Sequence, residues 1–129
     1  MVELEVRTAR REEMVDVTAR VQAVVAASGV GEGLCHLYCP HTTCGLAVNE
    51  GHDDDVRRDV IVHLAGLIPE RGDWRHAEGN SDAHLKALLA GVDVTLPVAR
   101  GRLRVGRWQA VFLCEFDGPR SRRIWVTVR

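Results

Sequence analysis

Lysine and serine are scarce in this chain of 129 residues, and each scarcity argues against one kind of covalent chemistry. Lys86 is the only lysine among 17 basic residues, so a Schiff-base mechanism would depend on one side chain that we expect to lie exposed on a helix. Serine occurs only as Ser28, Ser81 and Ser121, and none has the Gly-x-Ser-x-Gly surroundings of a nucleophile elbow. We therefore set aside Schiff-base and serine-nucleophile mechanisms.

Long apolar runs and an excess of one charge are also absent. The longest apolar runs, Val24 to Ala27 and Ala110 to Cys114, are far shorter than the roughly 20 residues of a membrane-spanning helix. The first residues show no basic region followed by an apolar stretch, so we expect no signal peptide and a cytoplasmic protein. Because 17 basic and 18 acidic residues are interspersed, nucleic acid is not an expected partner, and neither is a membrane.

The four cysteines do not form a recognisable pattern. Cys35, Cys39, Cys44 and Cys114 include no pair with the two-residue gap of a zinc ribbon or a thioredoxin-like site. Free cysteine commonly behaves as a small buried apolar residue. We expect these side chains to be buried and assign them no chemical role.

Hydrophobic patterning predicts a single domain over residues 1–129. Val2-Glu3-Leu4-Glu5-Val6 shows the period-two alternation of a half-buried strand, and similar runs bounded by turn residues predict about seven strands. These lie over residues 2–7, 34–40, 45–48, 92–99, 103–105, 108–116 and 124–128. Three helices are expected, from a cap at Asp16 or Thr18 to Gly29, from Asp53–Asp55 to Pro69, and from a cap at Asn80 or Ser81 to Gly91. This order predicts an α+β fold with a mainly antiparallel sheet system.

Three histidines suggest a metal site. His76 and His84 flank the predicted start of the third helix, and His41 follows a strand. Neutral imidazole is the most common nitrogen ligand of zinc, and three histidines with an open position make a catalytic site. Their convergence is a hypothesis, and three unrelated surface or hydrogen-bonded histidines are the alternative.

Anionic ligands have a second set of candidate partners. The backbone N–H groups of residues 81–83 at a helix start suit a phosphate, and Arg120, Arg122 and Arg123 could add donors. Ordinary helix capping and solvated arginines explain the same residues. Asp53, Asp55 and Asp59 with Glu50 could hold Mg²⁺ or could simply cap a helix. Glu115 ends an apolar strand, so its carboxylate needs a partner, for which Arg120 and Arg122 are the candidates.

Long blocks of the sequence, in the expected order and covering essentially the whole chain, resemble the YjbQ-type family. One departure is Asp54, which stands where the family often has proline. The blocks that carry the resemblance are His41-Thr-Thr-Cys-Gly-Leu-Ala-Val-Asn-Glu50, Asp55-Val-Arg-Arg-Asp59, His76-Ala-Glu-Gly-Asn-Ser-Asp-Ala-His84, Gly106-Arg-Trp-Gln109 and Glu115-Phe-Asp-Gly-Pro-Arg120.

The resemblance implies an architecture and a set of site residues. The expected fold is a two-sheet β-sandwich of seven strands with helices, assembled as a homotrimer. A divalent metal, zinc or magnesium, would bind His41, His76 and His84. The expected catalytic residues are His41, Glu50, His84, Glu115 and Arg120, and the expected substrate-binding residues are Thr42, Thr43, Asn80, Ser81 and Arg122.

The resemblance also implies an activity, because family members are often described as secondary thiamine-phosphate synthases. Such a transferase joins a pyrimidine diphosphate to a thiazole phosphate and releases pyrophosphate, so its catalysis would be mainly electrostatic. Two alternatives remain open on the residues themselves. One is a metal-dependent hydrolase of a small phosphorylated metabolite. The other is a trimeric module that binds an anion or metabolite without catalysis.

Overall fold

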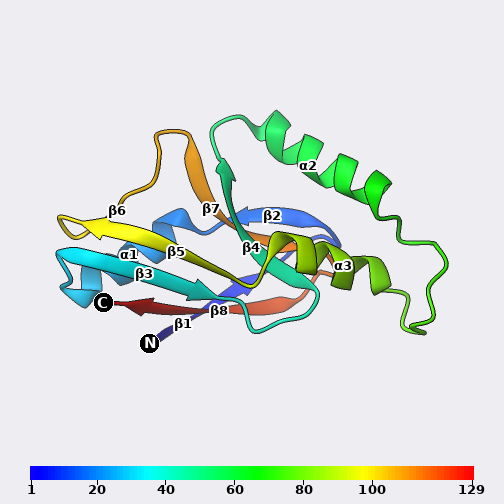
Figure 1. Cartoon of the computed structure of the whole chain (residues 1–129), viewed down its shortest axis with the longest axis horizontal. Coiled ribbons are helices and arrows are strands. Elements are labelled where there is room, and N and C mark those ends of the chain that lie inside the picture. Colours follow the sequence, from blue (N-terminus) through cyan, green and yellow to red (C-terminus); the bar gives the residue numbers. More distant parts are fainter.

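The computed structural model describes all 129 residues and contains eight strands and three helices (Figure 1). No helix in it is both long enough and apolar enough to cross a membrane. In chain order the elements are β1 (Val2–Arg7), β2 (Glu13–Asp16), α1 (Thr18–Ser28), β3 (Glu32–Tyr38), β4 (Cys44–Glu50), α2 (Asp54–Leu67), α3 (Ser81–Ala90), β5 (Asp93–Ala99), β6 (Arg102–Leu103), β7 (Gln109–Glu115) and β8 (Ser121–Val128).

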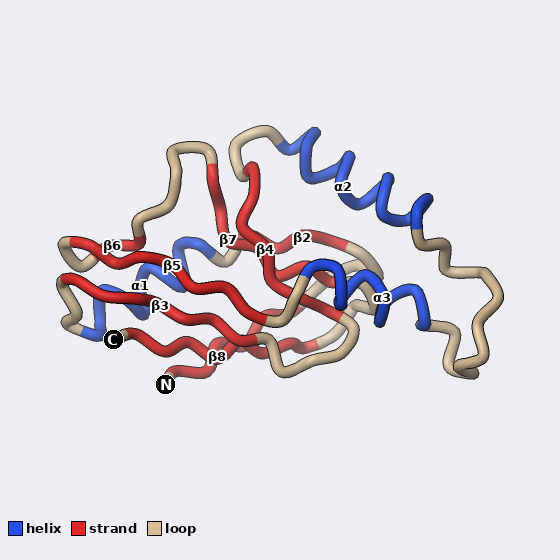
Figure 2. The backbone as a smooth tube through the Cα atoms, viewed as in Figure 1, coloured by secondary structure: helices blue, strands red, loops and turns tan.

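The strands form two antiparallel sheets (Figure 2). The larger sheet has the order β1-β8-β3-β5-β6, and the smaller has the order β2-β7-β4. Val2 of β1 pairs with Val126 of β8, which places the two chain termini side by side. The predicted α+β sandwich is therefore confirmed.

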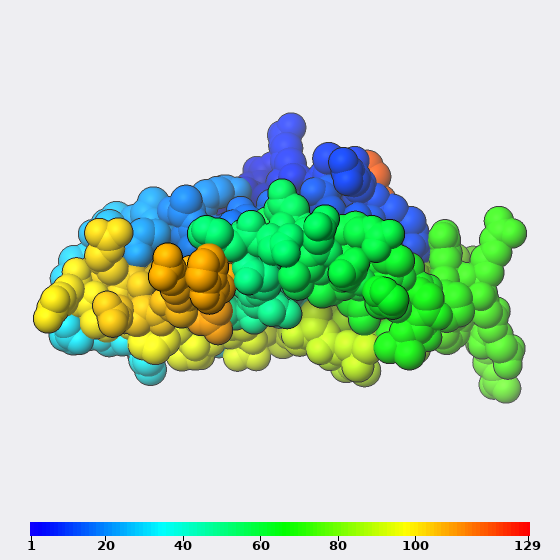
Figure 3. Space-filling view, turned by 90° about the horizontal axis from the view of Figure 1, so that it is seen from above, coloured from blue at the N-terminus to red at the C-terminus, as the bar shows by residue number.

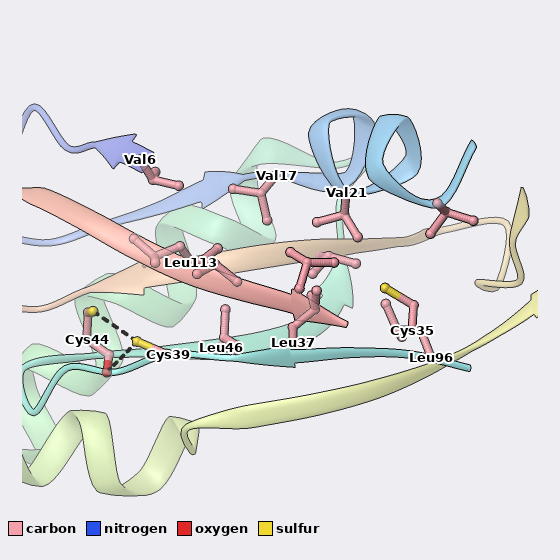
Figure 4. Packing of buried hydrophobic residues seen from close by; sticks show 14 of the residues in the cluster. Val6, Val17, Val21, Cys35, Leu37, Cys39, Cys44, Leu46, Leu96 and Leu113 are labelled. Carbon is pink, nitrogen blue, oxygen red and sulfur yellow. Dashed lines mark hydrogen bonds between the residues drawn. The ribbon is translucent and has the colours of Figure 1, made fainter. Parts of the chain in front are cut away.

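The main hydrophobic core lies between the two sheets (Figure 4). Leu37 of β3 and Ile124 of β8 contribute from the larger sheet, and Leu46 of β4 and Leu113 of β7 contribute from the smaller one. Helix α1 adds valines, among them Val21, from one side. Burial of these side chains on facing strands gives the sandwich its main apolar stabilisation.

Helices α2 and α3 cover the outer face of the smaller sheet. Phe112, Cys114 and Phe116 point to this side, where they pack with Ala83 and Ala87 of α3 in a second core. No residue of α2 is fully buried, so this helix lies along the surface of the molecule. The segment of residues 68–80 that joins α2 to α3 projects at one end, as Figure 3 shows in light green.

One strand was absent from the sequence prediction. Strand β2 pairs Met14 with Cys114 and Val15 with Leu113 of β7, and it completes the smaller sheet. Because only four residues form it, its pattern is too short to stand out before the partner strand is in place. The expected cap of α1 at Asp16 or Thr18 is wrong by one residue, because Val17 is the N-cap; Oδ1 of Asp16 still accepts a hydrogen bond from the backbone N–H of Thr18 at 2.9 Å.

Candidate functional site

His84 in the first turn of α3 contacts the loop between β3 and β4. Its Nδ1 lies 3.0 Å from the carbonyl oxygen of Thr42. A carbonyl only accepts, so Nδ1 carries the proton in this bond, and Nε2 of the neutral ring keeps its lone pair. The structure thus fixes the orientation and tautomer of one predicted catalytic imidazole and leaves its second nitrogen for a ligand.

Close packing of α3 on β4 makes this contact possible. Gly45 follows the loop, and a Cβ atom at this position would lie 2.6 Å from the carbonyl oxygen of Gly91, just beyond the helix. Only glycine allows this approach without a shift of the backbone. The same glycine therefore lets the end of α3 pack closely on the first residues of β4.

His76, from the segment before α3, lies against His84. The two ring centroids are 5.4 Å apart and the rings are nearly perpendicular, at 80°. Nε2 of His76 is also 3.7 Å from a carboxylate oxygen of Glu78. The structure therefore brings together two of the three histidines that the sequence singled out.

Asp117 connects the start of α3 to the turn before β8. Its Oδ2 accepts hydrogen bonds from Nδ2 of Asn80 at 2.9 Å and from the guanidinium of Arg120 at 3.0 Å. Nε of Arg120 also donates to the Asp117 carbonyl oxygen, while half of this side chain stays exposed. We refer to the connected residues as the His84 surface: Thr42, His76, Asn80, His84, Asp117 and Arg120.

Asn80 leaves one polar atom of this surface without a partner. Its Oδ1 is buried and accepts no hydrogen bond from the protein. A buried acceptor without a donor costs free energy unless a water or ligand supplies one. Asn80 therefore offers an acceptor to a bound molecule.

His41 is directed to a different partner. Its Nε2 accepts a hydrogen bond from the backbone N–H of Arg123 at 2.9 Å, so the ring is neutral with its proton on Nδ1. Burial lowers the pKa of His41, and the nearby charges of Arg122 and Arg123 lower it further. The imidazole thus joins the loop between β3 and β4 to the backbone near the start of β8.

The predicted three-histidine metal site is not assembled in the single chain. No group of three His, Cys, Asp or Glu side chains is placed so that it could hold a metal ion. His76 and His84 are neighbours, but the Nε2 lone pair of His41 is used by Arg123. The side chains present therefore make a pair of imidazoles, which is an incomplete ligand set for catalytic zinc.

Glu115 and Arg122 form a buried ion pair at the end of the smaller sheet. Nε of Arg122 donates to Oε1 of Glu115 at 2.9 Å, and Thr8 adds a second donor at 2.8 Å. Arg122 also donates to Oγ1 of Thr43 at 2.7 Å. The predicted need of Glu115 for an arginine partner is confirmed, and the partner is Arg122.

This ion pair changes the interpretation of three predicted site residues. Glu115 is fully buried, Arg122 is 4% exposed and Thr43 is 6% exposed. Their hydrogen-bonding groups are directed at one another and at the backbone, as when Phe116 donates to the Thr43 carbonyl oxygen. The structure therefore places Glu115, expected as a catalytic residue, and Thr43 and Arg122, expected to bind substrate, beneath the surface of the chain.

Glu50 lies away from the His84 surface. It ends β4, while Thr42 and Thr43 precede that strand, so about 20 Å of extended chain separates them at roughly 3.3 Å per residue. Its Oε2 accepts a hydrogen bond from the backbone N–H of His52 at 2.6 Å, and Oδ1 of Asp53 accepts one from Asp55 at 2.9 Å. The helix-capping interpretation is confirmed for Asp53, the N-cap of α2, and the structure does not bring Glu50 to His84.

The start of α3 offers fewer free N–H groups than the sequence suggested. The N–H of Ala83 donates to the carbonyl oxygen of Asn80 at 3.0 Å, and the N–H of His84 points to the same oxygen at 3.3 Å. The side chain of Asn80 does not cap the helix, because it is drawn to Asp117. Ser81 is buried in the first turn.

The only lysine is buried, not exposed as expected. Lys86 is 1% exposed, and its Nζ donates to Asp82 at 2.9 Å and to Glu12. Burial alone would raise the pKa of Asp82, but hydrogen bonds from Arg11 and Lys86 outweigh it and hold this pKa below its usual value. The buried amine is engaged by two carboxylates, so Lys86 remains excluded as a nucleophile, now for a structural reason.

The sequence did not indicate the contacts of Asp117 or the contact between Cys39 and Cys44. Asp117 was visible as part of the Asp-Gly-Pro turn, but its link to Asn80 joins residues 37 positions apart in the chain. Nothing in the local pattern indicates this contact. Only the packing of α3 beside the end of β7 produces it.

Comparisons with known proteins agree on the family of this chain. Residues 2–129 match the model described as "UPF0047 protein YjbQ-like". The UPF0047 protein MJ1081 of Methanocaldococcus jannaschii is 41% identical over 124 residues, which cover 96% of this chain and 90% of that protein.

Two solved structures superpose on the full length of the chain. The YjbQ/UPF0047 protein of Clostridium acetobutylicum has a TM-score of 0.98 with 40% identity, and both chains are covered completely. The conserved hypothetical protein TT1486 of Thermus thermophilus has a TM-score of 0.93 with 51% identity and the same complete coverage. None of these names specifies a reaction.

Proposed function

The chain belongs to the UPF0047 (YjbQ-like) family, and we propose that it is an enzyme that acts on a small phosphorylated molecule at the His84 surface. The orientation of His84 carries the proposal. Its Nδ1 is held by the Thr42 carbonyl oxygen, and its Nε2 keeps an available lone pair. An imidazole fixed at one nitrogen and free at the other is suited to take up or deliver a proton.

Arg120 and Asn80 supply groups that would bind the substrate. The guanidinium of Arg120 is half exposed, and only part of its donor set is used by Asp117. Arginine binds phosphate oxygens through two parallel hydrogen bonds, so Arg120 suits a substrate phosphate. The unpartnered Oδ1 of Asn80 suits an N–H or O–H donor on the same molecule.

Among reactions of phosphorylated substrates, we propose the synthase first. It would join a pyrimidine diphosphate to a thiazole phosphate and release pyrophosphate. The leaving group gains negative charge in the transition state, so a positioned guanidinium lowers the barrier. In this scheme Arg120 binds the departing diphosphate and His84 moves a proton, while Glu115 and Arg122 hold the loop in place from below.

The direct test measures thiamine phosphate formed from the two purified substrates. We expect turnover by the unaltered protein and a loss of about 10²-fold or more in Arg120→Ala, because the guanidinium meets developing charge. Arg58→Ala is the matched control, since Arg58 is an exposed arginine on α2. Unchanged turnover in Arg120→Ala would contradict the assignment.

A metal-dependent hydrolase is the second candidate. It is favoured by the hydrogen bond of His84 to a backbone carbonyl, which is the support usually given to metal-binding histidines. His76 and His84 would hold the ion, and a bound zinc would supply a water of lowered pKa. Elemental analysis of the protein and of His84→Ala tests this candidate, which requires metal and hydrolysis to disappear together.

We also propose a homotrimer whose subunit contacts include α3. Leu88 and Leu89 of this helix are 82% and 62% exposed, close in sequence to His84. Several exposed apolar side chains on one element are typical of an interaction surface. A trimer would place a neighbouring subunit beside the His84 surface.

If a ligand binds tightly at the His84 surface and no product forms in any assay, the non-catalytic binding module is the better description.

A further inference from the structure

Cys39 and Cys44 are in sulfur-to-sulfur contact inside the molecule. Their Sγ atoms lie 3.3 Å apart, and both side chains are buried (Figure 4). Cys39 follows β3 of the larger sheet, and Cys44 begins β4 of the smaller sheet. The pair therefore sits where the chain crosses from one sheet to the other.

The other two cysteines have different surroundings. Cys114 belongs to the second core, on the opposite face of the smaller sheet from Cys44. Cys35 lies within β3, four residues before Cys39, and no sulfur contact forms there. With only two thiols and no third ligand in place, the pair does not make a metal site. Instead the two sulfurs contact each other, and either thiol can be the donor.

The two cysteines enclose the loop that supports the His84 surface. Residues 40–43 lie between them. In this loop His41 accepts from Arg123, the Thr42 carbonyl oxygen accepts from His84, and Thr43 accepts from Arg122. A covalent link between Cys39 and Cys44 would close a ring that contains all three of these loop residues.

We propose that Cys39 and Cys44 form a reversible intramolecular disulfide that clamps the loop of residues 40–43. A disulfide has an S–S length of about 2.05 Å, so the sulfurs need to approach by only a little more than ~1 Å. An effect of this clamp on turnover would rest on the proposed function. The disulfide itself does not.

The chemistry balances with a peroxide as the oxidant. One thiol attacks the O–O bond of hydrogen peroxide, which gives a sulfenic acid and one water. The second thiol attacks the sulfenic sulfur, which forms the S–S bond and releases a second water. Two electrons pass from the sulfurs to the peroxide. A dithiol such as dithiothreitol reverses the reaction by thiol–disulfide exchange.

The experiment treats the folded protein with hydrogen peroxide, quenches it in denaturant, and alkylates the remaining thiols with iodoacetamide. The untreated chain should take up four labels, one for each cysteine, and the oxidised chain should take up two. Its mass before labelling should fall by two hydrogen atoms, and peptide mapping should show Cys39 joined to Cys44. Dithiothreitol should restore all four labels.

Matched variants and a structural measurement complete the test. Cys35→Ala and Cys114→Ala should still form the link, whereas Cys39→Ala should not. Peptide mapping of the oxidised, unaltered protein identifies which cysteines are linked even if one variant folds poorly. Four labels after oxidation, a link to Cys35 or Cys114, or a sulfinic acid without a link would each overturn the proposal.

The clamp itself is measured by amide hydrogen exchange over residues 39–46. Slower exchange in the oxidised form is expected, and equal exchange would show that the bond does not constrain the loop. Thiol labelling, peptide mapping and hydrogen exchange need no substrate, so a failed synthase assay would not change their interpretation. Conversely, a missing disulfide leaves the role of His84 intact.

Discussion

Nδ1 of His84 donates a hydrogen bond to the carbonyl oxygen of Thr42 across 3.0 Å, and this contact joins α3 to the loop between the two sheets. The bond connects residues 42 positions apart and directs Nε2 away from the backbone. Proton transfer from a side chain held in this way typically contributes 10²- to 10⁴-fold to a rate. The role of His84 can therefore be separated from its contribution to the fold.

His84→Asn is the sharpest substitution for that purpose. The amide N–H of asparagine can replace Nδ1 as donor to Thr42, but nothing replaces Nε2. We expect the free energy of unfolding to change little and turnover to fall by about 10²- to 10⁴-fold. His63→Ala, at an exposed position of α2, serves as the control. Full activity in His84→Asn would show that Nε2 takes no part.

Glu115→Gln should affect stability. The substitution leaves the buried guanidinium of Arg122 without its counter-charge, and breaking a buried ion pair in this way costs about 3–5 kcal/mol. Urea denaturation followed by circular dichroism would measure the change. Glu5→Gln, which alters an exposed pair with Arg7, should leave the unfolding midpoint nearly unchanged. A Glu115→Gln protein with normal stability and no activity would contradict this structural role and would support the catalytic role expected from the sequence.

Alkaline pH should weaken the fold through the buried thiol of Cys35. Burial raises the pKa of Cys35 from 9.0 to about 11. Above pH 9 the unfolded chain releases this proton more readily than the folded chain, so stability present at neutral pH is lost as pH rises toward 11. One such thiol changes the free energy of unfolding by at most about 1.4 kcal/mol per pH unit.

Urea titrations at pH 7, 9, 10 and 11 would check this dependence. Cys35→Ala should show a smaller loss of stability between pH 9 and 11 than the unaltered protein. Val98→Ala makes a comparable cavity without a titrating group, so its loss with pH should match that of the unaltered protein. Parallel pH profiles for Cys35→Ala and the unaltered protein would contradict the prediction.

The proposed trimer has a direct measure in solution. The chain has a mass of 14.3 kDa, so light scattering after gel filtration should give about 43 kDa. Leu88→Asp puts a charge on the exposed face of α3 and should shift the protein toward smaller species. A single 14.3 kDa species of the unaltered protein would rule out the trimer.

Much of the fold was predictable because it depends on local patterning. Alternation of apolar and charged residues marked β1, and the acidic residues before α2 marked its start, where Asp53 accepts from Asp55. The tertiary arrangement was still needed for β2, which is held by its pairing with β7. Short segments take their structure from a partner that local sequence does not identify.

The candidate site, like the fold, was predictable only where it depends on local sequence. The sequence by itself determined which residue types are concentrated near the start of α3, and it required a partner for the buried carboxylate of Glu115. Only the tertiary structure decided that His84 contacts Thr42, that His41 turns to Arg123, and that Glu50 accepts from the backbone of His52. The reason is physical: periodicity reports the environment of neighbouring residues, whereas convergence of distant side chains depends on how helices and sheets pack.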